Sequence, residues 1–280
     1  MATLFPPSSP ALPAFRSLIV EGNYHASAPI HLCLSHLAQS GSKRAILLLP
    51  SRTKFTAALK KLNDDWLNQH GGEGKCSRLA RHIDILYPPT PAHLAFLLSM
   101  FHQAQDSDKV EFTRKTTFAA VPSLLVLCEL SSYLAGNPDA TISSYLSMVS
   151  QALSCASSLL ATSGSTVSLA VFDSGLTDLK LPILRPVFMQ ALEKERHSTE
   201  QPEQKEDPIP NAVPVAFLAH RFFDWIGEFT RDQESHRPSN FHTFKLRRQP
   251  SSNEDEIIWR WRERQNTTSS GQQSITFMWI

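Results

Sequence analysis

Short apolar runs recur along the chain, separated by longer amphipathic stretches, and this alternation constrains the fold more than any other feature. Three runs stand out, at residues 17–21 (SLIVE), 45–49 (AILLL) and 123–127 (SLLVL). A run that is apolar at almost every position is typical of a strand buried on both faces, as in a parallel sheet covered by helices. The pattern therefore predicts an α/β fold with a doubly wound, mostly parallel sheet.

The stretches around these runs supply further elements. Weaker strands are predicted at residues 82–87 and 167–172. Apolar residues that recur at three- and four-residue spacing predict helices between the strands. The expected helices span residues 30–39, 53–69, 91–105, 141–160 and a region near 183–194.

The end of the chain has a different pattern. Residues 241–248, 256–264 and 274–280 alternate apolar and polar positions, which predicts antiparallel strands added at the C-terminal edge of the sheet.

Residues 1–16 are interrupted by prolines and are expected to form a flexible N-terminal segment. Residues 193–212 begin rich in Glu, Lys and Gln, without apolar anchors, so a disordered surface insertion is expected there. We expect one domain over residues 1–280.

Composition indicates which partners and which cellular compartment fit the chain. Its 27 basic and 26 acidic residues give a net charge of +1, so a nucleic-acid site would need a local basic patch. The four cysteines are widely spaced, which fits a reducing compartment better than a disulfide framework. The N-terminus lacks the pattern of a signal peptide, and the longest apolar stretch, residues 118–130, is too short for a membrane span. We expect a soluble, intracellular protein.

The loop after the first apolar run stands where an α/β nucleotide-binding core holds phosphates. Backbone N–H groups of a glycine-rich loop and the start of the next helix bind them there. Against the pattern G-x-x-x-x-G-K-[ST], only Gly22 matches, while Ser27, Ala28 and Pro29 replace the second glycine, the lysine and the hydroxyl residue. The start of the helix is kept, but the phosphate-binding lysine and the magnesium-binding hydroxyl are absent.

The magnesium-positioning aspartate of such cores is also replaced. It normally ends the apolar strand that reads SLLVL here, and Cys128 and then Glu129 follow that run. A neutral thiol cannot act as a hard carboxylate ligand, and Glu129 lies one position late, on the opposite face if the strand continues. We therefore expect Glu129 to be a surface residue at the end of the strand. Both the phosphate-binding loop and the magnesium-binding position of a nucleotide site are therefore degenerate.

Several segments resemble a known family. The Tyr-Pro-Pro turn at residues 87–89, the Leu-rich helix directly after it, and the PSLLVLCELSSYL segment at residues 122–134 are similar to the small RecA-superfamily recombinase paralogue that associates with a SWIM-type zinc protein in the Shu recombination-mediator complex. The resemblance covers residues 17–160, and the C-terminal third only in outline. It implies a RecA-like fold, binding to DNA and to the SWIM-type partner, support of recombinase filament assembly in DNA repair, and a nuclear location.

Members of that family can carry an intact phosphate loop and ATPase activity, and this sequence departs from them there. The second apolar run is followed by Pro50-Ser51-Arg52-Thr53, without the glutamate that activates water in RecA-like enzymes. No catalytic role and no cofactor carry over, so we expect a pseudo-ATPase. Two other readings stay open: a structural subunit of an Elongator-type ring that modifies tRNA, and an enzyme that binds nucleotide through a nonstandard loop.

Two groups of basic residues are candidates for contact with DNA. In residues 257–264 the alternation places Trp259 and Trp261 on one face and the arginines on the other. A charged outer row of this kind can contact phosphates, or it can simply be a solvated sheet edge. The expected DNA-binding residues are Lys245, Arg247, Arg248, Arg260, Arg262 and Arg264. The other basic group is Lys43, Arg44, Arg52, Lys54, Lys60 and Lys61.

An aromatic cluster and the histidines are two further candidates for sites. Phe222, Phe223, Trp225 and Ile226 are predicted to form a bulky helical stripe, for core packing or for partner docking. The histidines are scattered without ligand spacing, and the sequence has neither the G-x-S-x-G nor the H-E-x-x-H motif. The sequence therefore predicts no metal site.

Overall fold

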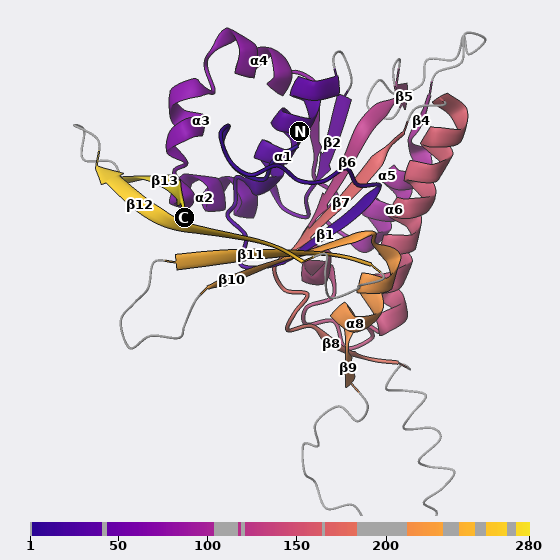
Figure 1. The fold of residues 1–280 in the computed structure, drawn as a ribbon. Coiled ribbons are helices and arrows are strands. Elements are labelled where there is room, and N and C mark those ends of the chain that lie inside the picture. The colour runs from indigo at the N-terminus through magenta and orange to yellow at the C-terminus, as the bar shows by residue number, and fades with distance from the viewer. Residues whose placement is uncertain are drawn as a thin grey trace, which may run out of the picture.

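A computed structural model describes residues 2–40, 44–103, 117–118, 121–163, 166–183, 212–231, 241–249, 256–267 and 273–280. Nine strands form one sheet in the order β13-β12-β11-β10-β1-β7-β6-β2-β3, and those from β3 to β10 run parallel (Figure 1). The strands of this sheet are β1 (Ser17–Gly22), β2 (Arg44–Leu48), β3 (Ile83–Leu86), β6 (Pro122–Cys128), β7 (Ser168–Asp173), β10 (Trp225–Arg231), β11 (Phe241–Arg248), β12 (Ile257–Thr267) and β13 (Gln273–Trp279). The predicted α/β class, with a mostly parallel sheet and antiparallel strands at one edge, is confirmed, and the architecture is consistent with a RecA-like fold.

Helices cover both faces of the parallel part of the sheet (Figure 1). The helices are α1 (Ala28–Ser40), α2 (Arg52–Leu62), α3 (Asp65–His70), α4 (Gly74–Ala80), α5 (Pro91–Met100), α6 (Ile142–Ser163) and α8 (Val215–Ala219). Two 3-10 helices, η1 (Leu130–Tyr133) and η2 (His220–Phe222), follow β6 and α8. Two small sheets pair β4 (His102–Gln103) with β5 (Thr117–Phe118) and β8 (Lys180–Pro182) with β9 (Ala212–Pro214).

The central strands contribute alternate side chains to two hydrophobic cores, as a doubly wound sheet requires. On one side, Leu125 and Leu127 of β6 pack in the cluster that holds the buried residues of α5 and α6. On the other side, Leu124 and Val126 pack in the cluster of α1 and the C-terminal strands. Every residue of β6 is buried, which is why its sequence is apolar without alternation.

The predicted helix over residues 53–69 is two helices. Asn63 adopts a left-handed conformation (φ 49°) and ends α2, and its N–H donates to the carbonyl of Leu59. Asp64 then caps α3 by accepting a hydrogen bond from the N–H of Leu67. The break turns the chain so that α3 lies beside β13, where the N–H of Ile275 donates to the carbonyl of Asn63 (3.1 Å).

The expected helical stripe from Phe222 to Ile226 is wrong. The 3-10 helix η2 ends at Phe222, the chain extends at Phe223, and β10 begins at Trp225. Phe223 and Ile226 are buried in the core beside α6, so the interpretation as core residues holds for these two, while Phe222 is 38 % exposed. Trp225 and Ile226 belong instead to a strand, in which they pair in parallel with Leu18 and Ile19 of β1.

Residues 2–16, for which a flexible segment was expected, pack against the rest of the fold. Leu4, Phe5 and Leu12 are buried, and the ring of Phe5 lies 4.9 Å from Trp261 and 4.7 Å from Trp279, between ring centroids. The N–H of Thr3 donates to the hydroxyl of Ser35 in α1 (2.8 Å). The segment therefore completes the core between α1 and the C-terminal strands. The predicted helix near 183–194 and the insertion at 193–212 lie almost wholly outside the described residues.

Candidate functional site

The loop between β1 and α1 lies at the carboxyl edge of the sheet, where a RecA-like core would bind nucleotide. Its one match to the phosphate-loop pattern, Gly22, has a positive φ of 80°. A Cβ at this position would lie 2.2 Å from the carbonyl oxygen of Phe229 in the neighbouring strand β10. The close approach of β10 thus requires glycine here whether or not phosphate binds.

Ser27, at the position of the second glycine, belongs to a buried polar network. Its hydroxyl donates to a carboxylate oxygen of Asp64 (2.6 Å) and lies 3.0 Å from Nδ1 of His25. Nε2 of His31 lies 2.8 Å from the same Asp64 oxygen. Burial works to raise the pKa of Asp64, but the hydrogen bonds and charge of His31, together with the Ser27 hydroxyl, lower it overall. Burial also lowers the pKa of His25 well below its usual value.

This network ties the start of α1 to α3. Ser27 and His31 come from the loop and the first turn of α1, whereas Asp64 is the residue that caps α3. Sequence reasoning identified Ser27 only as a missing glycine and did not find Asp64, which lies 37 positions away. The network therefore gives the loop a structural role.

The next two positions provide no polar side chain. Ala28, in place of the lysine, is fully buried and begins α1. Pro29 follows in the first turn of that helix, where its missing N–H costs nothing. The structure agrees with the expectation that the helix start is kept without the charged and hydroxyl groups.

Cys128 is the last residue of β6 and is 2 % exposed. Burial, followed by the nearby charge of Glu129, raises the pKa of its thiol well above the usual value. A thiol that stays neutral and buried is neither a magnesium ligand nor a reactive nucleophile.

Glu129 follows the end of the strand, as expected, but it is half-buried rather than a surface residue. The strand ends at Cys128, and Glu129 takes a left-handed conformation (φ 56°) that turns its side chain along the carboxyl edge. Its carboxylate accepts hydrogen bonds from the hydroxyl of Tyr24 and from the hydroxyl (2.8 Å) and N–H (3.4 Å) of Ser174. Glu129 therefore links the loops that follow β1, β6 and β7.

A cavity of about 410 Å³ lies between this carboxylate and α2. Tyr24 forms part of its wall, and the Tyr24 ring packs against Phe172. Lys54 of α2 also lines the cavity. The cavity can hold a small group, and its walls combine the Glu129 carboxylate and apolar side chains with the polar side chains of Ser51 and Lys54. Its lining residues are Asn23, Tyr24, Ala26, Pro29, Leu49, Pro50, Ser51, Lys54, Phe55, Ala58, Cys128, Glu129, Ser132 and Ser174.

Two other carboxylates at the carboxyl edge escaped sequence analysis. Glu21 at the end of β1 pairs with Nε2 of His220 (3.0 Å). Asp173 at the end of β7 accepts hydrogen bonds from the N–H and hydroxyl of Ser131 and from the hydroxyl of Tyr145. Glu21 is the last residue of the run at 17–21, and Asp173 directly follows the strand predicted at 167–172, so the end of an apolar strand is the signal that could have found both.

The C-terminal strands place most of the expected basic residues on one face. Trp259 and Trp261 are buried, while the arginines between and after them are exposed, which confirms the predicted alternation. Thr243 pairs with Arg260, so Lys245 and Arg247, two and four positions further along β11, share the arginine face. We call this face the basic row, and it consists of Lys245, Arg247, Arg260, Arg262 and Arg264.

Arg248 does not belong to the basic row. It lies one position beyond Arg247 and therefore on the opposite face, where its guanidinium lies 5.9 Å from the ring centroid of Trp225. Within the row, Arg262 stacks over Phe241 of β11 at 4.4 Å from the ring centroid.

In the other basic group, Arg44 pairs with Asp84 (2.7 Å), and Lys43 lies outside the described residues.

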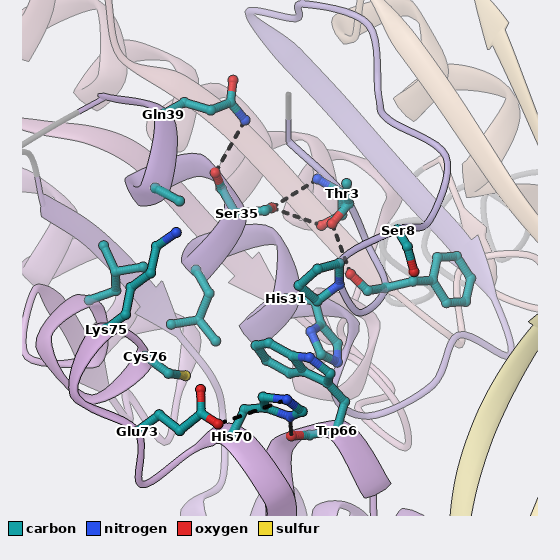
Figure 2. Close-up of a pocket in the computed structure, with 15 residues that line it drawn as sticks. Thr3, Ser8, His31, Ser35, Gln39, Trp66, His70, Glu73, Lys75 and Cys76 are labelled. Atoms are coloured by element: carbon teal, nitrogen blue, oxygen red, sulfur yellow. Dashed lines mark hydrogen bonds and ion pairs between the residues drawn. The ribbon is translucent and has the colours of Figure 1, made fainter.

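A larger cavity, of about 580 Å³, lies between α1, α3, α4 and the N-terminal segment (Figure 2). Figure 2 shows His31, Trp66 and His70 together on one side of it, with Thr3 and Ser35 joined above them. The rings of Trp66 and His70 are stacked, with centroids 5.0 Å apart. This cavity was not anticipated, because segments that are distant in the sequence build it.

No helix in the described part of the chain is long and apolar enough to span a membrane. The same residues hold no cluster of three or more His, Cys, Asp or Glu side chains that would fit a metal ion. The sequence matches no protein-family model, and a search of curated proteins also found no match.

Proposed function

We propose that this protein is a non-catalytic RecA-like subunit of a Shu-type recombination-mediator complex in the nucleus. In this role it binds DNA and a SWIM-type zinc protein and supports assembly of the recombinase filament in homologous-recombination repair. The observation that carries the proposal is the combination of a RecA-like sheet with a nucleotide-binding edge whose polar groups are bonded to one another. Ser27 is bonded to Asp64, and Glu129 to Tyr24 and Ser174.

The first prediction concerns nucleotide. The purified protein is expected to hydrolyse no ATP and to gain no thermal stability from millimolar MgATP, since Ala28, Pro29 and Cys128 supply no phosphate or magnesium ligand. A ligand present at one hundred times its Kd stabilises a protein by about 2.7 kcal/mol, so thermal melting would detect even a micromolar site. A rise in Tm that disappears when a chelator removes magnesium would contradict the proposal.

The second prediction concerns DNA. Replacing Arg260 and Arg262 together by alanine is expected to reduce the slope of log K against log salt by about two units, because each lost phosphate contact removes about 0.9. Affinity at 0.15 M salt should fall about thirtyfold by the same relation, and equally for all sequences. Fluorescence anisotropy with labelled oligonucleotides over a salt series measures both quantities.

The control for this experiment is the double variant Arg52→Ala/Lys54→Ala, which removes the same charge from α2. It should leave the salt slope unchanged. If the α2 variant weakens binding while the variant in the basic row does not, the interface belongs to α2, and the row is a solvated sheet surface.

The partner is tested by co-expression. A stable complex with a SWIM-type zinc protein, observed by size exclusion with light scattering, is expected. Recovery of the chain in a six-membered ring with Elongator-type subunits would contradict the proposed function and favour a role in tRNA modification.

A further inference from the structure

On the outer edge of β13, some backbone groups have no hydrogen-bond partner in the part of the chain that the structure describes. The N–H of Ile280 donates to the carbonyl of Arg260 in β12 (3.1 Å), so even-numbered residues of β13 bond inward. Odd-numbered residues bond outward, as the N–H of Ile275 does to Asn63 (3.1 Å). Phe277 and Trp279 follow in the same phase, and no described residue bonds to their N–H groups. The edge is thus closed at Ile275 and open beyond it.

The open edge borders a groove of about 210 Å³. On one side of the groove is α3, with Asp65, Trp66 and Gln69, and on the other is the N-terminal segment at residues 6–8. The β13 residues that line it are Ile275, Thr276, Phe277 and Trp279. The groove therefore lies beside the unpaired backbone and has side chains on both flanks, as a site for an added strand requires.

The groove is lined by two carboxylates, Asp64, which is bonded to His31, and Asp65. Among the described residues that line it there is no Lys, Arg or His. The carboxylate of Asp65 accepts hydrogen bonds from the hydroxyl of Ser274 (3.0 Å) and the side-chain amide of Gln69 (2.8 Å), and both donors are neutral. A basic side chain near Asp65 and Gln69 would complement this charge.

The groove adjoins the larger cavity of Figure 2, because Pro7, Ser8 and Trp66 line both. A peptide longer than the few residues that can pair with β13 can thus continue into a hollow with apolar walls, including Leu34 and Leu79.

We propose that the outer edge of β13 pairs with an extended segment of a partner protein, and that this segment carries a Lys or Arg side chain facing Asp65 and Gln69. Unpaired strand edges are completed by another strand, and backbone hydrogen bonds supply the affinity. A second copy of this chain fits poorly, since two β13 edges would bring two Asp65 carboxylates together and β13 contains no basic residue. The inference does not depend on the proposed function.

The test uses the full chain and a fluorescein-labelled eight-residue peptide of alternating lysine and valine as the probe. Anisotropy should show saturable binding. A peptide of the same sequence with a methyl group on every backbone nitrogen, and one with glutamate in place of lysine, should each bind at least tenfold more weakly. Equal binding of the methylated peptide would overturn the proposal, because it would reduce the contact to charge alone, and absence of binding by the parent peptide would overturn it as well.

Two variants locate the contact. Gln69→Lys places a positive charge in the groove and should weaken binding about tenfold. Met278→Lys adds the same charge to β13 at a residue that is 46 % exposed and does not line the groove, so it should leave binding unchanged. Equal effects of the two variants would place the contact elsewhere. Self-association in analytical ultracentrifugation that Gln69→Lys abolishes would assign the edge to a second copy of the chain and also overturn the proposal.

Discussion

Replacing Trp261 by alanine is expected to lower the free energy of unfolding by about 3–5 kcal/mol, the range for removing a large aromatic side chain from a core. Trp261 is 1 % exposed, and its ring lies within 6 Å of the rings of Phe5, Phe229 and Trp279, between centroids. Its indole N–H has no hydrogen-bond partner among the described residues, so the loss would be one of packing. Urea denaturation followed by circular dichroism measures the effect.

Arg262→Ala is the matched control, one position along the same strand and on the opposite face. Arg262 is exposed, and its described contact is the stacking over Phe241 at 4.4 Å. We expect a loss of at most about 1 kcal/mol, as for other exposed side chains and cation–π pairs. If Trp261→Ala cost no more than this control, the N-terminal segment and the C-terminal strands would not share the core described above.

The sequence was most informative where burial leaves one choice of structure. The runs SLIVE, AILLL and SLLVL are the central strands β1, β2 and β6, because a strand covered on both faces must be apolar throughout. The alternation around Trp259 and Trp261 likewise fixed which side of β12 faces the core. In both cases the burial of the strand faces determines the sequence periodicity, so the periodicity predicts which side chains are buried.

Local patterns failed where contacts distant in the sequence decide the outcome. The apolar spacing of residues 53–69 is helical throughout, yet Asn63 and Asp64 break it because they bond to β13 and to Ser27. The prolines of residues 1–16 predicted a flexible segment, but the side chain of Phe5 is buried among aromatic rings that lie more than 200 positions away in the sequence. No window of the sequence contains both partners of these contacts.

For the candidate site, the sequence predicted only which phosphate-binding and magnesium-binding groups are missing. A motif comparison finds that Ala28 and Pro29 do not match a phosphate loop, but it cannot show that Ser27 bonds to Asp64 or that Tyr24 bonds to Glu129. The turn at Glu129 depends on a left-handed backbone conformation, which a strand-based extrapolation from SLLVL does not anticipate.

Asp173 gives the fold a pH dependence opposite to that of most acidic residues. Burial raises its pKa from 3.8 to about 6, although hydrogen bonds from Ser131 and Tyr145 act in the other direction. Between these two values the folded chain holds a proton that the unfolded chain has released. Folding is therefore favoured at the acidic end of the interval, and the free energy of unfolding falls as the pH rises through it.

Asp173→Asn is expected to remove this dependence. The amide keeps an oxygen that can accept from the Ser131 N–H and the Tyr145 hydroxyl, which both bond to Oδ2 in the native protein. The free energy of unfolding of the native protein relative to the variant should fall by about 2 kcal/mol between pH 4 and pH 6, since one pKa unit corresponds to about 1.4 kcal/mol and titration is incomplete at both ends of this range. Urea denaturation of both proteins across this range measures the difference, and groups common to the two proteins cancel.

Asp139→Asn, at an exposed position, controls for loss of a charge and should follow the native protein at each pH. A constant difference between the native protein and Asp173→Asn from pH 4 to pH 6 would mean that Asp173 titrates alike in the folded and unfolded chains.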